Sequence, residues 1–179
     1  MGFVHIHRHG EFSALDGIGT ANQYAERAAA IGQSALALTD HATLAGALLH
    51  IEACQEQGIK PIVGCEVYFR EDRLTAKDRK DSTYYHLVLI AKNETGWRNL
   101  IRITSEAYRT GFYGKPCVDW ALLERYGEGL IATAACMSGL LPKMMFKTDD
   151  KGARSNIQRM QNLFGEDFYI EIMPSTIEK

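Results

Sequence analysis

The sequence predicts an α/β fold, with short apolar strands and amphipathic helices arranged around a mostly parallel sheet or barrel. The 179 residues are 46% hydrophobic and 23% charged, which is typical of globular domains with a sizeable core. Strand-like and helix-like segments alternate, and the strand-like segments are rich in Val, Ile, Leu and Ala on both faces. Neither a linker nor an internal repeat divides the chain, so residues 1–179 are expected to form one domain.

Each element is predicted from its local pattern, read from the N-terminus onward. The expected strands are residues 3–7, 35–39, 59–69, 84–91, 129–135 and 168–173. The expected helices are residues 21–32, 44–58, 95–109, 119–126 and 153–164. Thr20 and Thr43 are placed to cap the first two helices, and Gly32 and Gly58 to end them. Between the third and fourth strands, the charged segment 70–83 is interpreted as a solvated loop in preference to a phosphate-binding patch, because its charges nearly balance.

Composition excludes several classes of protein. Lys and Arg total 20 against 22 Asp and Glu, so any contact with DNA must be local or made through a metal. No N-terminal signal and no apolar run of about 18 residues is present, which predicts a soluble, cytoplasmic protein without membrane association. The four cysteines are scattered and form no CxxC motif, which argues against a disulfide framework or a zinc ribbon. Most of them are expected in the core.

Polar residues that can bind metal gather at strand ends. The stretch "HIHRHGEFSALDG", residues 5–17, places three histidines at alternate positions, which share one face of an extended strand. Asp16 lies in the loop just beyond this strand, and the residues at or beside the other expected strands are Asp40, His41, Glu66, His86 and Cys136. Because the carboxyl ends of parallel strands converge, these side chains are expected to meet at one site.

Imidazoles combined with a bridging carboxylate are typical ligands of Zn, Mn or Fe. Two such ions can hold a phosphate and generate a hydroxide nucleophile at neutral pH, so the pattern indicates a phosphoesterase. His5 lies deeper in the first strand and His50 falls within a helix; both are expected to be hydrogen-bonded core residues and not ligands.

Several phrases of the sequence resemble the polymerase and histidinol phosphatase (PHP) domain family. The ligand pattern is shared across that family, and "FSALDG", "GIKPIVGCE" and "NETGWRNLIRITSEAY" are similar to the branch at the N-terminus of bacterial DNA polymerase III alpha subunits, the C-family replicative polymerases. The similarity covers nearly the whole chain in the expected order. It implies a distorted (β/α)7 barrel with two or three metal ions at the carboxyl ends of the strands.

The resemblance also implies roles for individual residues. The implied metal ligands are His7, His9, Asp16, His41, Glu66, His86 and Cys136. The first five of these are the implied catalytic residues, and Asp40 is interpreted as a residue that orients a ligand. The family completes its site with an Asp-x-His motif, but no histidine follows His86. The barrel is therefore expected to be truncated before its last strand, and this chain alone to bind metal weakly with little or no exonuclease activity.

Three functions remain open from the sequence. The first is a metal-dependent phosphoesterase acting in DNA replication as a 3′–5′ proofreading exonuclease, with the DNA 3′ end and the remaining polymerase domains as partners. The second is a metal-binding structural support for the polymerase. The third is a free small-molecule phosphatase of the histidinol phosphate type. The polymerase's own catalytic carboxylates are absent from these residues, so the chain alone is not expected to extend DNA.

Overall fold

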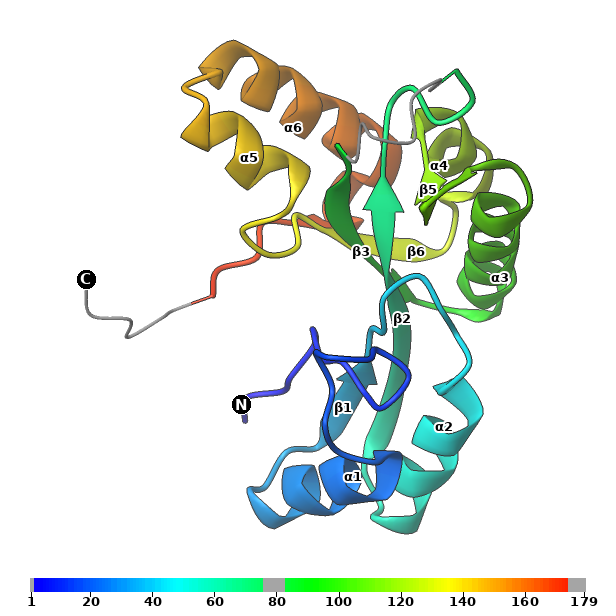
Figure 1. Cartoon of the computed structure of the whole chain (residues 1–179). Helices are drawn as coiled ribbons and strands as arrows, with labels where there is room; N and C mark the ends of the chain where they lie inside the picture. The colour runs from blue at the N-terminus through cyan, green and yellow to red at the C-terminus, as the bar shows by residue number, and fades with distance from the viewer. Residues whose placement is uncertain (1, 76–82, 174–179) are drawn as a thin grey trace.

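The computed structural model describes residues 2–75 and 83–173, which form a mixed α/β domain (Figure 1). The strands are β1 Ala35–Leu38, β2 Lys60–Phe69, β3 Tyr85–Ala91, β4 Phe112–Tyr113, β5 Lys115–Val118, β6 Leu130–Thr133 and β7 Phe168–Tyr169. The α-helices are α1 Ala21–Ala30, α2 Ala47–Glu56, α3 Glu94–Thr110, α4 Trp120–Tyr126, α5 Leu140–Phe146 and α6 Asp150–Phe164. None of these described helices is long and apolar enough to cross a lipid bilayer.

The long strand β2 pairs with three other strands, β1, β3 and β5. The order of the sheet is β4-β5-β2-β3-β6-β7, with β1 also paired to β2. The first part of β2 pairs in parallel with β1, from Lys60 to Val63. Its second part pairs with β5 on one side and with β3 on the other. The helices α1 and α2 therefore lie beside the β1 end of β2, and the remaining helices lie around its other end (Figure 1).

The prediction of a mostly parallel sheet is wrong. Strand β3 runs antiparallel to both β2 and β6, and β4 and β5 form an antiparallel pair. Apolar runs identify buried strands, but they do not encode strand direction. The sheet of the described residues is also open, so the expected (β/α)7 barrel is not shown.

The start of the chain differs from the expected strand over 3–7. This segment is extended without forming a regular strand, although it lies alongside β1: the carbonyl of His5 accepts from Ala37 N, and that of Arg8 from Thr39 N. The segment keeps part of the predicted pairing and places the alternate histidines next to the sheet.

The predicted caps are right for α1 and wrong for α2. Thr20 forms a capping box with Gln23, as a Thr followed three residues later by Gln favours. Helix α2 begins at Ala47 after Gly46, and the Thr43 hydroxyl instead accepts from Ala45 N. The loop after β1 is consequently longer than expected.

The sequence analysis missed helix α5 and the β4–β5 hairpin. The hairpin turns at Gly114, whose φ of 73° lies in the left-handed region that glycine adopts without strain. Its strands are too short to give a period-two pattern, which explains why the sequence did not reveal them.

The two largest of four clusters of buried side chains among the described residues join most of the elements. The larger packs β2, β3 and β6 against α3, α4 and α6, with Phe69, Leu89 and Leu123 almost fully buried. The smaller joins α1, α2 and β1, with Cys54 at its centre. Cys65 and Cys117 are also buried, as expected for core cysteines, and all four thiols are free.

The charged segment after β2 begins inside the fold and not in solvent. Arg73 is buried, where it forms an ion pair with Asp119 and donates to the Thr110 hydroxyl. The Trp120 indole donates to Glu71. The prediction of a solvated loop is therefore wrong for the buried Arg70 and Arg73 and holds for the exposed Glu71, Asp72, Leu74 and Thr75. Residues 76–82 lie outside the described part of the chain.

Candidate metal centre

Glu66 is the centre of a cluster of histidines. Its side chain is only 1% exposed in the middle of β2. Oε2 of this carboxylate lies 3.2 Å from His7 Nε2, 3.0 Å from His9 Nε2 and 3.2 Å from His41 Nδ1, and Oε1 lies 2.7 Å from His86 Nδ1. One carboxylate therefore contacts imidazoles from widely separated parts of the sequence.

Strand pairing explains this convergence. His41 follows β1 and forms a parallel bridge with Glu66, which continues the β1–β2 pairing. His86 opens β3, and because β3 is antiparallel it lies opposite Tyr68 near the end of β2. The expected convergence at carboxyl strand ends holds for His41 after β1, whereas Glu66 lies within β2 and His86 near the amino end of β3.

The loop over residues 10–17 lies at the entrance to the cluster and is held in place by hydrogen bonds to Asp40. Asp40 Oδ1 accepts from Gly10 N at 2.6 Å and from the Ser13 hydroxyl at 2.7 Å. Ser13 Oγ in turn accepts from His41 N at 2.9 Å. Asp40 is buried and anchors the loop. It was expected to orient a metal ligand, but its hydrogen bonds orient the backbone of the loop.

Asp16 and Cys136 lie at the margins of the cluster. Asp16 Oδ2 is 2.8 Å from His41 Nε2, and its side chain is 55% exposed at the mouth of the site. The Cys136 sulfur lies 3.6 Å from His86 Nδ1 and 3.7 Å from Glu66 Oε1. The hydrogen bond with His86 lowers the pKa of the Cys136 thiol, which favours the thiolate that binds metals.

The sequence analysis missed Glu171, which follows β7. His7 Nδ1 donates to Glu171 Oε1 at 2.7 Å, and the Thr133 hydroxyl donates to Oε2 at 2.8 Å. This carboxylate directs the other nitrogen of His7 toward Glu66. A lone glutamate inside the apolar run "FYIEIM" was the available signal, because a carboxylate in such a run needs a partner.

Neither His5 nor His50 belongs to the two groups of potential metal ligands found among the described residues. His50 is buried and its Nε2 lies 3.0 Å from the Leu36 carbonyl, as expected for a core histidine. His5 is exposed, with its ring 4.8 Å from that of Phe3, so its expected place in the core is wrong.

The electrostatics of the cluster show strong coupling between Glu66 and the imidazoles. Burial raises the pKa of the Glu66 carboxyl, but hydrogen bonds from His7, His86 and His9 lower it further than burial raises it. Burial lowers the pKa of His7, yet its bonds to Glu171 and Glu66 raise it to about 10. Burial also lowers the pKa of His86, but its hydrogen bonds to Cys136 and Glu66 raise this pKa to about 9. His7 and His86 thus favour the protonated form beside an ionised Glu66, whereas burial lowers the pKa of His41.

The arrangement of donor atoms fits metal ions. Three imidazole nitrogens crowd one oxygen of Glu66, although a carboxylate oxygen has only two lone pairs. His9 Nδ1 is also buried without a hydrogen-bond partner among the described residues. The donor atoms of His7, His9 and Glu66 lie within 4.8 Å of one another, as do those of His41, Glu66 and His86. These two groups share a carboxylate, as the ligands of a pair of divalent cations often do.

Comparison with known proteins decides the family, because residues 5–175 match the PHP domain. The chain belongs to the PHP domain family. This PHP domain is 40% identical over 184 residues to the DNA polymerase III subunit alpha of Treponema pallidum, covering 100% of the chain and 16% of the relative.

Two further relatives have the same name. The DNA polymerase III subunit alpha of Borreliella burgdorferi is 40% identical over 172 residues, covering 95% of the chain and 15% of the relative. That of Aquifex aeolicus is 39% identical over 182 residues, covering 98% of the chain and 16% of the relative. The PHP domain described here thus matches only about one sixth of the length of these relatives.

Proposed function

We propose that this PHP domain is a metal-dependent phosphoesterase that acts on the 3′ end of DNA as part of a DNA polymerase III alpha chain. The observation that carries the proposal is the buried Glu66 shared by four histidines. Such a shared carboxylate suits a two-metal site for phosphate chemistry. The similarity to DNA polymerase III alpha subunits supports DNA as the substrate and the other polymerase domains as partners.

The ligands divide into two groups around Glu66. His7 and His9 would hold one cation, and His41 and His86 the other. Asp16 lies beside His41 and Cys136 beside His86, so both are near the second group. Zn, Mn or Fe suits this mixture of imidazole and carboxylate donors. Bound ions would supply a hydroxide nucleophile and neutralise the phosphate charge.

Residues around the ligands keep the imidazoles in place. Glu171 fixes the ring of His7, and Asp16 accepts from His41 at the open side of the site. The ring of Tyr68 stacks on that of His41 with centroids 5.7 Å apart, which excludes water from one side of the imidazole. We further propose that the open sheet is part of the distorted (β/α)7 barrel that the resemblance implies.

A structural supporting role and a small-molecule phosphatase are the competing functions. The test measures metal content and the hydrolysis of bis(p-nitrophenyl) phosphate, an activated phosphodiester, after loading with Mn²⁺, Zn²⁺ or Fe²⁺. We expect bound metal and slow metal-dependent hydrolysis that Glu66→Gln and His9→Ala abolish and His5→Asn preserves. Bound metal without hydrolysis above the Glu66→Gln background, both in this chain and in a longer chain that adds the Asp-x-His motif, would contradict the proposal and favour structural support. Faster hydrolysis of histidinol phosphate than of any diester would favour the small-molecule phosphatase.

A further inference from the structure

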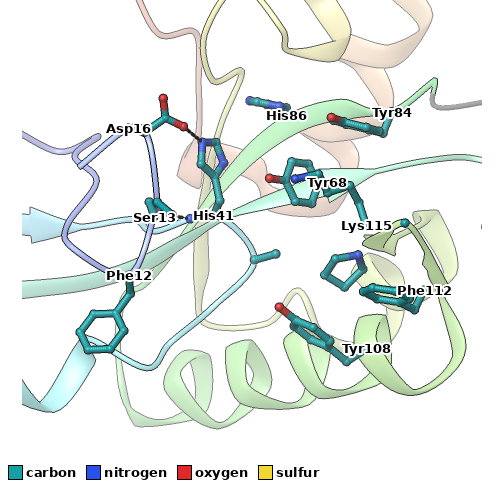
Figure 2. A pocket seen from close by; sticks show the side chains of 14 residues that line it. Phe12, Ser13, Asp16, His41, Tyr68, Tyr84, His86, Tyr108, Phe112 and Lys115 are labelled. Atoms are coloured by element: carbon teal, nitrogen blue, oxygen red, sulfur yellow. Dashed lines mark hydrogen bonds and ion pairs between the residues drawn. The ribbon is translucent and has the colours of Figure 1, made fainter. Parts of the chain in front are cut away.

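A groove of about 490 Å³ opens beside the metal-ligand cluster, a size within the usual range of ligand sites. His41, His86 and Asp16 line its inner end (Figure 2). Five aromatic side chains also line the groove, and of these the proposed metal chemistry uses only Tyr68, which stacks on His41. The groove therefore has a polar end for a phosphate and an apolar length for another part of a ligand.

Two tyrosines connect the cluster to the groove. The ring of Tyr84 is nearly parallel to that of His86, with centroids 6.0 Å apart, and meets Tyr68 edge to face at 4.8 Å. Tyr68 is 6% exposed and packs against His41, so it forms a fixed wall. A ligand in the groove next to the cluster around Glu66 would lie against this wall.

The other end of the groove has exposed aromatic rings. Tyr108 on α3 and Phe112 on β4 are 51% and 52% exposed, and their rings stack with centroids 6.1 Å apart and an interplanar angle of 21°. Figure 2 shows both at one end of the groove. A flat pair of rings that remains half exposed provides a surface on which a planar group can stack.

Lys115 lies between the aromatic rings and the cluster. Its Nζ is 5.0 Å from the centre of the Tyr68 ring, and the side chain points toward the tyrosines in Figure 2. Among the described residues, no carboxylate lies within ion-pair distance of Lys115. An exposed ammonium group without such a partner, close to a metal-ligand cluster, is suited to a second phosphate.

We propose that the groove binds the 3′ end of a single-stranded nucleic acid, with the terminal base on Tyr108 and Phe112, the last phosphodiester at the cluster around Glu66 and a neighbouring backbone phosphate at Lys115. The inference rests on the proposed function, because the scissile phosphodiester must reach the cluster around Glu66. Aromatic stacking together with a cation is the usual means of binding single strands without reading sequence. A small phosphomonoester of the histidinol phosphate type would leave the Tyr108–Phe112 surface uncovered.

The test measures the affinity of a 5′-fluorescein-labelled oligothymidylate of eight nucleotides by fluorescence anisotropy. Its last linkage is a phosphorothioate, which suppresses cleavage, and a second probe lacks only the terminal base. The variants are Tyr108→Leu with Phe112→Leu, and Lys115→Gln. Phe146→Leu and Lys147→Gln are the matched controls, because both side chains are exposed outside the groove. Thermal unfolding checks that each variant is folded.

We expect the aromatic double variant to weaken binding of the complete probe about fivefold or more, the lower range for losing one stacked base. It should have little effect on the probe without the terminal base. Lys115→Gln should weaken both probes and reduce the salt dependence by about one phosphate contact. The control variants should bind as the unchanged chain does.

Unchanged affinity in the aromatic variant, or an equal loss with both probes or with Phe146→Leu, would overturn the inference. Hydrolysis of bis(p-nitrophenyl) phosphate by the same variants separates this inference from the proposed function. Hydrolysis that persists while the groove variants bind DNA normally contradicts only the groove. If the chain without substitutions shows no metal-dependent hydrolysis but binds DNA through the groove, only the proposed phosphoesterase function is contradicted.

Discussion

Glu66 and Glu171 are both carboxylates in apolar stretches of sequence, but their surroundings give them different tasks. Glu66 receives imidazoles on both oxygens, whereas Glu171 binds one imidazole and one hydroxyl. A histidine that binds metal through one ring nitrogen commonly donates its other N–H to such a carboxylate. Glu171 is therefore interpreted as a positioning residue for His7.

Replacing Glu171 tests this role. Glu171→Ala is expected to weaken the affinity for Mn²⁺ or Zn²⁺ about 10- to 100-fold, as for other partners of metal-bound histidines. Glu171→Gln should retain most of the affinity, because its amide oxygen can still accept from His7 Nδ1. Titration against a chelator of known affinity measures both. A Glu171→Ala variant that binds metal normally would show that His7 needs no such partner.

His50 gives a pH dependence of stability that is separate from the metal centre. Burial and the nearby Arg8 lower the pKa of His50 to about 4 from an ordinary value of 6.5, while the Leu36 carbonyl and Asp40 oppose the shift. Cys54 also contacts its ring. Because the folded protein binds this proton less tightly, the stabilisation is complete above pH 6.5 and is lost as the pH falls toward 4.

The change is measured against His50→Gln, whose amide can still donate to the Leu36 carbonyl but does not titrate. Relative to this variant, the unchanged chain should lose about 2–3 kcal/mol of unfolding free energy between pH 6.5 and 4. Urea unfolding at several pH values measures the difference. Parallel pH profiles for the two proteins would contradict a depressed pKa for His50.

At the scale of single residues, the sequence was informative where a local pattern existed. The alternation of His7 and His9 and the pair Asp40–His41 stand next to strand signals, and the structure brings both histidine motifs to Glu66. Glu171 has no local motif, and the side chain that it orients lies 164 residues away in the chain. Contacts of that range depend on the complete topology, which the sequence pattern did not determine.

At the scale of elements, the loop over 10–17 depends on a close approach of two glycines. A Cβ added to Gly17 would lie 2.0 Å from the carbonyl oxygen of Gly10. The carbonyl of Gly10 also accepts from Ser13 N, which begins the turn that leads to Asp16. At position 17, therefore, the loop has no room for any residue larger than glycine.

Gly17→Ala is expected to open this loop and destabilise the fold by about 1–3 kcal/mol, as overpacking generally does. Amide hydrogen exchange should increase over residues 10–17, and the affinity for metal should fall because His9 and Asp16 flank the turn. Gly2→Ala is the matched control, since its added Cβ would meet Gly32 at an ordinary 3.7 Å. Unchanged exchange in Gly17→Ala would mean that the loop adapts without loosening.

Strands were predictable where they were long and apolar, as for β2 and β3, but their directions were not. The antiparallel β3 brings His86 beside the end of β2, so this histidine reaches Glu66 through a topology different from the expected one. The β4–β5 hairpin gave no sequence signal, although Lys115 and Phe112 on it line the groove beside the cluster. Short pairings of this kind are determined by tertiary packing and turn geometry.

At the scale of the whole molecule, the cluster ties together distant parts of the chain. The N-terminal segment carrying His7 has no regular strand, and the segment carrying Glu171 follows the last described strand. Both reach the sheet partly through this site, where Glu66 on β2 and Thr133 on β6 bind them. A bound cation would replace the His7–Glu66 contact with stronger ligand bonds and, through the His7–Glu171 hydrogen bond, restrain both segments.

Metal binding is therefore expected to stabilise the complete domain. An ion that binds only the folded state adds about 2.7 kcal/mol at a free concentration 100 times its Kd, which corresponds to a rise in Tm of roughly 5–10 °C for a domain of this size. Differential scanning calorimetry in Mn²⁺ or Zn²⁺ against EDTA measures the shift. Glu66→Gln should remove it, because both groups of ligands share this carboxylate, and His5→Asn should retain it, because His5 lies outside them. An equal shift in Glu66→Gln would place the stabilising ion elsewhere and would separate the stability of the domain from the site proposed for its chemistry.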